Sequence, residues 1–403
     1  MKLTYKHTKY ACYIGYITQA IINNLAPLLF LTFHNQFGIS LAAISGLISI
    51  NFCVQILVDF VSVKFVDRLG YRICSIAAFV LSAIGLTALG ILPNIMSNAY
   101  VGLVIATVIN AIGGGLLEVL VSPIIEALPG DEKDSAMSLL HSFYCWGHVG
   151  VVLISTLYFN VFGISNWMYL PVIWAVVPLL DLVLFTKVPL CKLVEDDELI
   201  PLRKVFTMKI FWLLLLLMIC AGASEQAMSQ WSSLFAEMGL GVSKTMGDLL
   251  GPCAFAVCMG TARAIYGKWG YRMDLKKFIV GSSILCIISY LITVFAPNPV
   301  LSLMGCAVCG FSVGIMWPGV FSLAGEYCRA GGTAMYALLA LGGDVGCSSG
   351  PSLVGLISGS TEKGGMDSLL QLTGSPLKTG MLFAIVFPVA MAMGIAALRK
   401  RKA

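Results

Sequence analysis

The sequence contains little charge. Asp, Glu, Lys and Arg together make up only 11% of its 403 residues, whereas a soluble globular domain carries about 25%. A water-exposed surface of ordinary composition cannot be built from so few charged side chains. The composition therefore excludes a soluble globular protein.

The sequence also lacks the motifs of several enzyme classes. No G-x-x-x-x-G-K-[ST] segment occurs, so we do not expect the chain to hydrolyse nucleotide by itself. No nucleophile–base constellation and no set of metal ligands appears, which disfavours a membrane enzyme. Cys306 and Cys309 have redox spacing, but they lie in an apolar run, where packing of small residues explains them. We expect no metal, no cofactor and no nucleic-acid partner.

Apolar residues are abundant instead. Hydrophobic residues make up 58% of the chain, and the mean hydropathy is +0.91. The 13 cysteines fall almost entirely inside apolar runs, where cysteine acts as a small hydrophobic residue, so no disulfide framework is implied. We expect an integral membrane protein whose surface contacts the lipid bilayer.

Twelve apolar runs are long enough to span a membrane, because a spanning helix needs about 20 residues. They lie at 10–33, 41–63, 73–93, 99–128, 136–162, 166–187, 207–236, 246–267, 275–296, 299–325, 332–358 and 378–398. We therefore predict an all-α membrane protein of twelve helices. Residues 1–187 and 207–403 would form two six-helix bundles, joined by a charged linker at 188–206.

The basic residues are unevenly distributed between the predicted loops. With both termini on the same side, 22 of the 25 Lys and Arg residues lie on that side. The other side holds Lys244, Lys363 and Lys378. Cytoplasmic loops carry the excess of Lys and Arg in membrane proteins. Both termini are therefore predicted to be cytoplasmic.

The two halves of the chain repeat each other. The segment VDRLGYR at 66–72 returns as YGKWGYR at 266–272, each expected in a short basic loop between two spans. GHVG at 147–150 has a counterpart in GDVG at 343–346. Duplicated bundles of this kind are common among secondary transporters.

The first copy of the repeated loop resembles the signature of the major facilitator superfamily, approximately G-x-x-x-D-R-x-G-x-R. Asp67, Arg68, Gly70 and Arg72 match it, and Val63 replaces the leading glycine. The resemblance covers the whole chain and implies the twelve-helix major facilitator fold. It further implies that Asp67, Arg68 and Arg72 take part in gating at the cytoplasmic ends of helices.

A narrower set of motifs is similar to the fucose permease branch of proton symporters. In the fourth span Glu118 and Pro123 fall on the pattern G-x-G-x-x-E-x-x-x-N-P, and Asn23-Asn24-Leu25 resembles that branch's N-N-L. Pro27 stands where that branch carries an acidic residue. Coupling to protons, coupling to sodium and no coupling therefore all stay open.

Glu118 is the leading candidate for proton coupling. It lies near the middle of an apolar run, where a carboxylate is expensive unless it lines a wet cavity or takes up a proton. Either condition suits a transporter. A protonated glutamate that only holds two helices together is the structural alternative.

Polar residues in the first and seventh spans are predicted to contact the substrate. Gln19 and Asn23 lie on one helix face, four residues apart, and Asn24 follows. In the seventh span the candidates are Glu225, Gln226 and Trp231. An aromatic ring among hydrogen-bonding side chains suits a sugar, although interhelical hydrogen bonds are the alternative explanation.

Three further residues receive predicted roles. His141 in the fifth span and Trp317 in the tenth are candidates for substrate contact. Arg263, near the cytoplasmic end of the eighth span, is predicted to be a gating residue paired with an acid such as Glu326.

Together these patterns predict a secondary active transporter of a small solute in the bacterial plasma membrane, acting as a monomer. The preferred function is proton-coupled uptake of a sugar or similar polyhydroxylated solute by alternating access. Proton-antiport efflux of amphipathic compounds and uncoupled facilitation are the alternatives. A receptor or scaffold built on a transporter fold is a fourth.

Overall fold

The protein is described by a computed structural model that covers residues 3–129, 133–191, 205–269, 274–327 and 332–398. Helices make up its regular structure, and these described residues contain no β-strand. Eleven helical segments among them are long and apolar enough to cross a membrane. The 31-residue helix α17 (Gly332–Glu362) is not one of the eleven, because its many glycine and serine residues and Asp344 lower its hydropathy. The all-α membrane fold is confirmed.

The chain divides into two compact units. Unit 1 consists of Met1–Ile39 and Ile50–Glu195, and unit 2 consists of Ser40–Ser49 and Asp196–Ala403. The start of α3 thus packs with unit 2, while the rest of that helix belongs to unit 1. Within unit 2, the Ser49 hydroxyl lies 2.5 Å from the Ser352 hydroxyl of α17.

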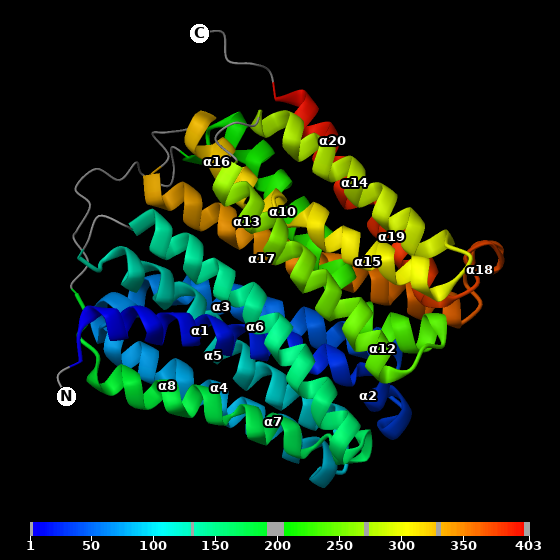
Figure 1. The fold of residues 1–403 in the computed structure, drawn as a ribbon, viewed down its shortest axis with the longest axis horizontal. Helices are drawn as coiled ribbons and strands as arrows, with labels where there is room; N and C mark the ends of the chain where they lie inside the picture. Colours follow the sequence, from blue (N-terminus) through cyan, green and yellow to red (C-terminus); the bar gives the residue numbers. More distant parts are fainter. Residues whose placement is uncertain (1–2, 130–132, 192–204, 270–273, 328–331, 399–403) are drawn as a thin grey trace. The chain divides into compact units, whose positions relative to one another are not determined.

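The helices of unit 1 run from blue to green in Figure 1. They are α1 (Tyr5–Asn24), the 3-10 turn η1 (Ala26–Leu29), α2 (Phe30–Phe37), α3 (Leu41–Leu69), α4 (Tyr71–Ile95), α5 (Ala99–Glu126), α6 (Lys133–Phe162), the 3-10 turn η2 (Ile164–Asn166), α7 (Tyr169–Trp174) and α8 (Val176–Lys187). The predicted first span is therefore interrupted. Pro27 lies at the break, because proline has no backbone N–H to continue an α-helix.

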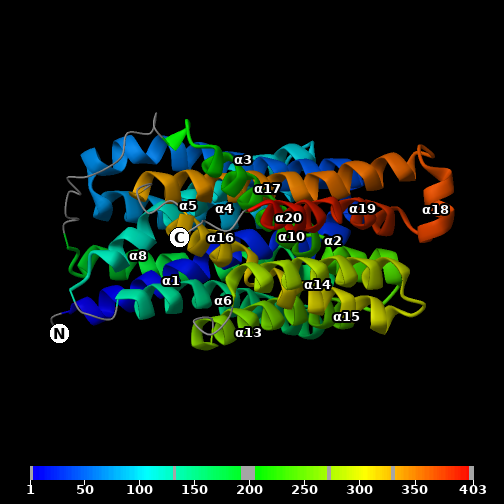
Figure 2. The same ribbon diagram turned by 90° about the horizontal axis from the view of Figure 1, so that it is seen from above.

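The helices of unit 2 run from green to red in Figures 1 and 2. They are α10 (Lys209–Ser229), α11 (Ser232–Leu234), the π-helix η3 (Phe235–Gly239), α12 (Lys244–Asp248), the π-helix η4 (Leu249–Cys253), α13 (Ala254–Trp269), α14 (Leu275–Phe295), α15 (Pro299–Val313), α16 (Met316–Tyr327), α17 (Gly332–Glu362), α18 (Asp367–Thr373), α19 (Pro376–Ala384) and α20 (Val386–Ala397). The eighth predicted span thus includes a π-helical turn at η4, whose last residues include Pro252.

Side-chain caps set several of the helix starts. Asn98 accepts hydrogen bonds from the backbone N–H groups of Tyr100 and Val101 at the start of α5. Asn298 and Ser375 cap α15 and α19 in the same way, each directly before a proline. These side-chain caps accept hydrogen bonds from backbone N–H groups that a helix leaves unpaired at its first turn, and a proline there has no N–H to pair.

The expectation of a short loop at 66–72 was wrong. Helix α3 continues to Leu69 and α4 begins at Tyr71, so Gly70 alone joins them. Gly70 has a φ of +84°, in a region that favours glycine because a side chain would clash there. The side chains of Asp67 and Arg68 lie outside the described part of the structure. In the second copy, at 266–272, the side chains of 267–269 and the whole of 270–272 lie outside it as well.

Both units pack their first helix against the helix that carries the repeated G-x-V-G motif. In unit 1, α1 packs on α6, and in unit 2, α10 packs on α17. A Cβ atom at Gly147 would lie 3.0 Å from Cβ of Ala20 on α1, and one at Gly346 would clash with the Ile219 carbonyl oxygen on α10. The glycines therefore let the backbones of the paired helices approach closely.

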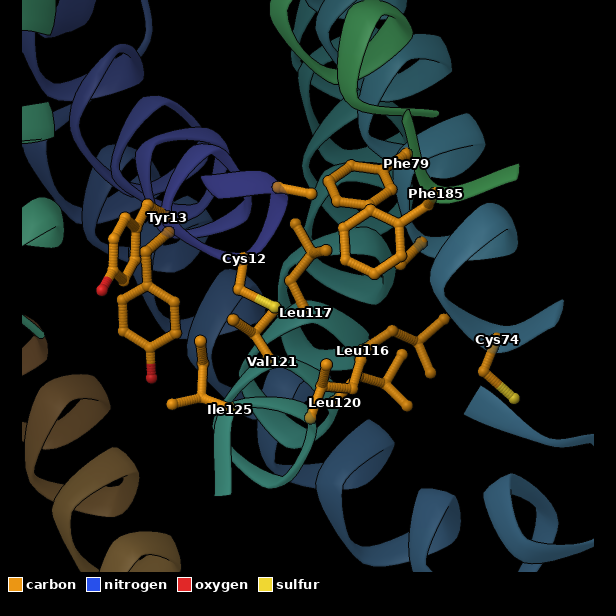
Figure 3. Packing of buried hydrophobic residues seen from close by; sticks show 14 of the residues in the cluster. Cys12, Tyr13, Cys74, Phe79, Leu116, Leu117, Leu120, Val121, Ile125 and Phe185 are labelled. Carbon is orange, nitrogen blue, oxygen red and sulfur yellow. The ribbon is translucent and has the colours of Figure 1, made fainter. Parts of the chain in front are cut away.

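The main apolar cluster of unit 1 lies between α1, α4, α5 and α8. Figure 3 shows Cys12 beside Leu117 and Val121, with the rings of Phe79 and Phe185 close by. Those two rings are tilted, with centroids 5.1 Å apart. This cluster fixes the positions of α1 and α5, which carry most of the candidate residues of unit 1.

The close approach of α17 to α10 should make the stability of the protein sensitive to added side-chain volume at Gly346. Gly346→Ala should lower the apparent Tm of the detergent-purified protein, with a loss of about 1–3 kcal/mol from overpacking against a backbone that cannot move aside. Gly281→Ala on α14 is the matched control, because a Cβ atom there meets nothing within 4 Å. Equal melting temperatures for the two variants would contradict the proposed contact.

Candidate functional site

Helices α1 and α5 bring Gln19 and Glu118 together in unit 1. The Gln19 side-chain amide donates a hydrogen bond to Oε2 of Glu118 at 3.1 Å. Asp59 on α3 interacts electrostatically with Glu118. Among the described residues no Lys, Arg or His forms an ion pair with Glu118. The carboxyl group thus has an uncharged donor as its partner, so no fixed positive charge holds it in the ionised form.

Asn23 lies one turn along α1 and joins the same polar cluster. Its side-chain oxygen accepts hydrogen bonds from the amide groups of Asn51, at 3.2 Å, and Gln55, at 2.9 Å, both on α3. A Cβ atom at Gly114 on α5 would lie 3.1 Å from Oε1 of Gln19 and 3.4 Å from Nε2 of Gln55. A glycine is needed here because any side chain would fill the space between the amides.

Asn51 and Gln55 were not among the residues predicted from the sequence. They lie four residues apart in the second span, and Asp59 follows after four more, so the three share one helix face. That spacing was a usable signal. We name Gln19, Asn23, Asn51, Gln55 and Glu118 the unit 1 polar cluster.

Two other candidates lie near this cluster. The Asn24 amide donates to the carbonyl of Ala20 at 2.9 Å and to the Tyr144 hydroxyl at 3.4 Å, so its donors serve helix packing. His141 is exposed, and its ring meets the ring of Tyr16 edge-on at 5.3 Å. The Tyr16 hydroxyl lies 3.1 Å from the Ser122 hydroxyl on α5.

In unit 2, Glu225 on α10 forms an ion pair with Arg263 on α13. Oε2 of Glu225 lies 3.5 Å from a terminal guanidinium nitrogen, and Nε of Arg263 donates to the Gly314 carbonyl at 3.3 Å. The expectation that Arg263 pairs with Glu326 is therefore wrong. Glu326 is exposed near the end of α16, whereas Arg263 reaches Glu225 in the last part of α10.

A chain of amides continues from Glu225 along α10. Gln226 donates to Oε1 of Glu225 at 3.3 Å, and Gln230 donates to Oε1 of Gln226 at 3.0 Å. All three side chains are buried. Five polar groups, from the Gly314 carbonyl through Arg263 and Glu225 to the two glutamines, are thus connected in series within unit 2.

The two tryptophan candidates pack against glycines. Trp231 is fully buried, donates its indole N–H to the Pro351 carbonyl at 3.0 Å, and lies 2.7 Å from the Cβ position of Gly355. Trp317 lies against Gly343 in the GDVG segment and meets Phe321 edge-on at 6.4 Å. In this state both rings contribute to the packing of α17.

Arg72 links α4 to the end of α8. Its guanidinium donates to the carbonyl oxygens of Phe185 and Val188, each at 2.7 Å. Phe185 is in the last turn of α8 and Val188 directly follows the helix, at the end where the macrodipole is negative and a cation is favoured. The side chains of Asp67 and Arg68, the other predicted gating residues, are outside the described set.

Solved structures share this fold over nearly the full chain. A bacterial homologue of the human lysosomal transporter Spinster, in an inward-facing and occupied conformation, matches with a TM-score of 0.77 at 15% identity, covering 98% of this chain and 97% of its own. A D-xylose–proton symporter matches with a TM-score of 0.76 at 13% identity, covering 95% and 96%. The Escherichia coli fucose–proton symporter FucP matches with a TM-score of 0.62 at 17% identity, covering 98% of each.

These identities are low, so the three structures establish the fold alone. No curated protein sequence matches this chain. The model of the Major Facilitator Superfamily, however, matches residues 12–351, most of the chain. Its members are transporters and not enzymes, in agreement with the absence of an enzyme motif. The chain is a multi-pass membrane transporter that belongs to the Major Facilitator Superfamily.

Proposed function

We propose that this protein takes up a sugar or similar small polyhydroxylated solute together with protons. It would act as a monomer in the bacterial plasma membrane, with both termini cytoplasmic. The bundles formed by 1–187 and 207–403 would alternate access to the solute. The observation that carries the proposal is the hydrogen bond from Gln19 to Glu118.

That contact joins a proton-binding group to a possible solute-binding group, and a coupled transporter needs both. Glu118 supplies a group that can gain and lose a proton, and its partner is an uncharged amide on a helix that carries other amides. Oε1 of Gln19 is buried and has no hydrogen-bond partner among the described residues. A solute hydroxyl that donates to Oε1 would thus sit beside the proton-carrying carboxyl group.

The chemistry of the unit 1 polar cluster favours a hydroxylated solute. Amide groups both donate and accept, as hydroxyl groups do, so Gln19, Asn23, Asn51 and Gln55 can recognise a sugar without adding net charge. Two of the structurally similar proteins are named as proton symporters of sugars, D-xylose and fucose. Their names support the solute class without identifying the solute.

In unit 2, Glu225, Gln226, Trp231 and Trp317 remain proposed solute contacts. His141 and Asn24 are their counterparts in unit 1. We further propose that Asp67, Arg68, Arg72 and Arg263 hold helix ends during gating, because Arg72 and Arg263 both donate to backbone carbonyls of a neighbouring helix.

Efflux of an amphipathic compound is the second candidate. The Spinster homologue has a higher TM-score than FucP, and its name does not point to a sugar. A thermal-shift screen of the purified protein against hexoses, pentoses, polyols, nucleosides and hydrophobic cations separates the two candidates. Stabilisation by the hydroxylated compounds alone supports uptake, and stabilisation by the cations alone supports efflux.

The role of Glu118 is tested in proteoliposomes with the hexose or pentose that the screen selects. Glu118→Gln should abolish accumulation driven by an inward proton gradient, at least tenfold, because the amide cannot carry a proton. Solute counterflow should persist, since the amide still accepts the hydrogen bond from Gln19. Glu362→Gln, which changes an exposed acid on α17, should leave both activities unchanged. Full accumulation by Glu118→Gln would remove Glu118 from the mechanism.

The contribution of the Glu225–Arg263 ion pair to stability can be tested separately. Glu225→Gln should destabilise the protein by about 1–3 kcal/mol, less than for a fully buried pair because the Arg263 side chain is 19% exposed. The double variant Glu225→Gln, Arg263→Gln should recover part of that loss, since no unneutralised charge stays behind. Thermal unfolding of the two single variants, Glu225→Gln and Arg263→Gln, and of the double variant measures the difference. Strictly additive losses would show that the two side chains do not interact.

A further inference from the structure

Asp181 on α8 has no place in the proposed site. It is fully buried in unit 1, on a helix that packs against α1 and α4. A Cβ atom at Gly15 on α1 would lie 3.8 Å from Oδ2 of Asp181, so the carboxyl group points toward α1. The missing side chain at Gly15 leaves room next to it.

The surroundings of Asp181 are apolar. The same Cβ position at Gly15 lies 3.3 Å from Cγ2 of Val121 and 3.6 Å from Cζ of Phe79. Phe185, one turn further along α8, is part of the cluster drawn in Figure 3, beside Phe79. The carboxyl group therefore lies at the edge of the main hydrophobic cluster of unit 1.

Neither carboxyl oxygen of Asp181 has a hydrogen-bond partner in the described part of the chain. No ion pair involves it there either. Almost every buried polar group in a folded protein has a partner, so two unpaired oxygens on one carboxyl group require an explanation. An ionised carboxylate without partners is far more expensive to bury than a neutral carboxyl group.

The titratable and charged groups on the surrounding helices do not neutralise Asp181. On α1 the Cys12 thiol interacts with it electrostatically and carries no positive charge. On α4, Arg72 directs its guanidinium to the carbonyls of Phe185 and Val188, and Cys74 is a thiol. On α5, Glu118 is held by Gln19. Tyr169 on α7 and Lys187 at the end of α8 are exposed.

We propose that Asp181 is a proton-binding site, separate from Glu118, that holds its proton as a neutral carboxyl group in the state described here. The proton is enclosed where α1 meets α8, so it can exchange with water only when that contact loosens. Occupancy of the site thus follows the position of α1, the helix that also carries Gln19 and Asn23. Its part in the transport cycle rests on the proposed function, but proton binding itself does not.

Carbon-13 NMR of protein labelled at the aspartate carboxyl carbons tests this directly in lipid nanodiscs. At pH 7.5 the wild-type protein should show a carboxyl resonance at the chemical shift of a protonated aspartic acid. Asp181→Asn should remove that resonance, and Asp367→Asn, at an exposed position on α18, should keep it. If the resonance lost in Asp181→Asn is that of an ionised carboxylate, the proposal is overturned.

Two further spectra test whether the Asp181 site binds protons and whether it is independent of Glu118. In Glu118→Gln the Asp181 resonance should keep its protonated shift. A change there would instead indicate one site shared by both acids. Replacing sodium chloride with choline chloride should leave the chemical shift of the Asp181 carboxyl carbon unchanged. A shift that depends on sodium would identify a cation site and contradict the proposal. Because no solute is present, these results stand or fall independently of sugar transport.

An amide cannot ionise, so Asp181→Asn should fold like the protonated wild type. Asp181→Leu keeps the experiment interpretable if the asparagine variant is unstable, because it also removes the resonance. Both variants should melt within a few degrees of the wild type at pH 7.5. A melting temperature that falls sharply in both variants would show that Asp181 is an ionised group with an essential partner, against the proposal.

Discussion

The structure depends on one constraint, that polar groups inside a membrane protein must find partners within the protein. For Asn23 and Glu118 in unit 1, amides provide these partners, bridging α1, α3 and α5 and leaving Glu118 with an uncharged donor. Unit 2 satisfies it with an ion pair extended by two glutamines. The two repeated halves therefore pair their buried polar groups with different chemistry. A carboxyl group without a fixed counter-charge is free to exchange a proton, whereas Glu225 is tied to Arg263.

Close helix packing provides the frame for both polar regions. Helices α6 and α17 pack on the first helix of each unit, and Gly147 and Gly346 allow close contact with it. Because α1 and α10 carry the candidate solute contacts, these glycines position the sites without touching them. The pairing of α1 with α6 is therefore repeated as the pairing of α10 with α17, although Gly147 is the first glycine of its motif and Gly346 is the last.

Much of the fold could be predicted from the sequence, because apolar length and the placement of basic residues directly reflect the bilayer. The ends of α5 and α14 fall within two residues of the predicted spans. The break at Pro27, the extension of α3 to Leu69 and the Glu225–Arg263 pair were not predicted. A break depends on local hydrogen bonding, and a pairing depends on which helix faces which. Neither is encoded in hydropathy. Asn51 and Gln55 were not predicted because their role depends on the contact of α3 with Asn23 on α1.

The central claim is that solute and protons move together. Proteoliposomes containing the purified protein and an internal pH indicator, with no imposed gradient, test it most directly. Adding the hexose or pentose chosen by thermal shift should acidify the interior as the solute enters, and Glu118→Gln should remove the acidification. Solute entry by the wild-type protein with no change of internal pH would contradict the account and identify a facilitator.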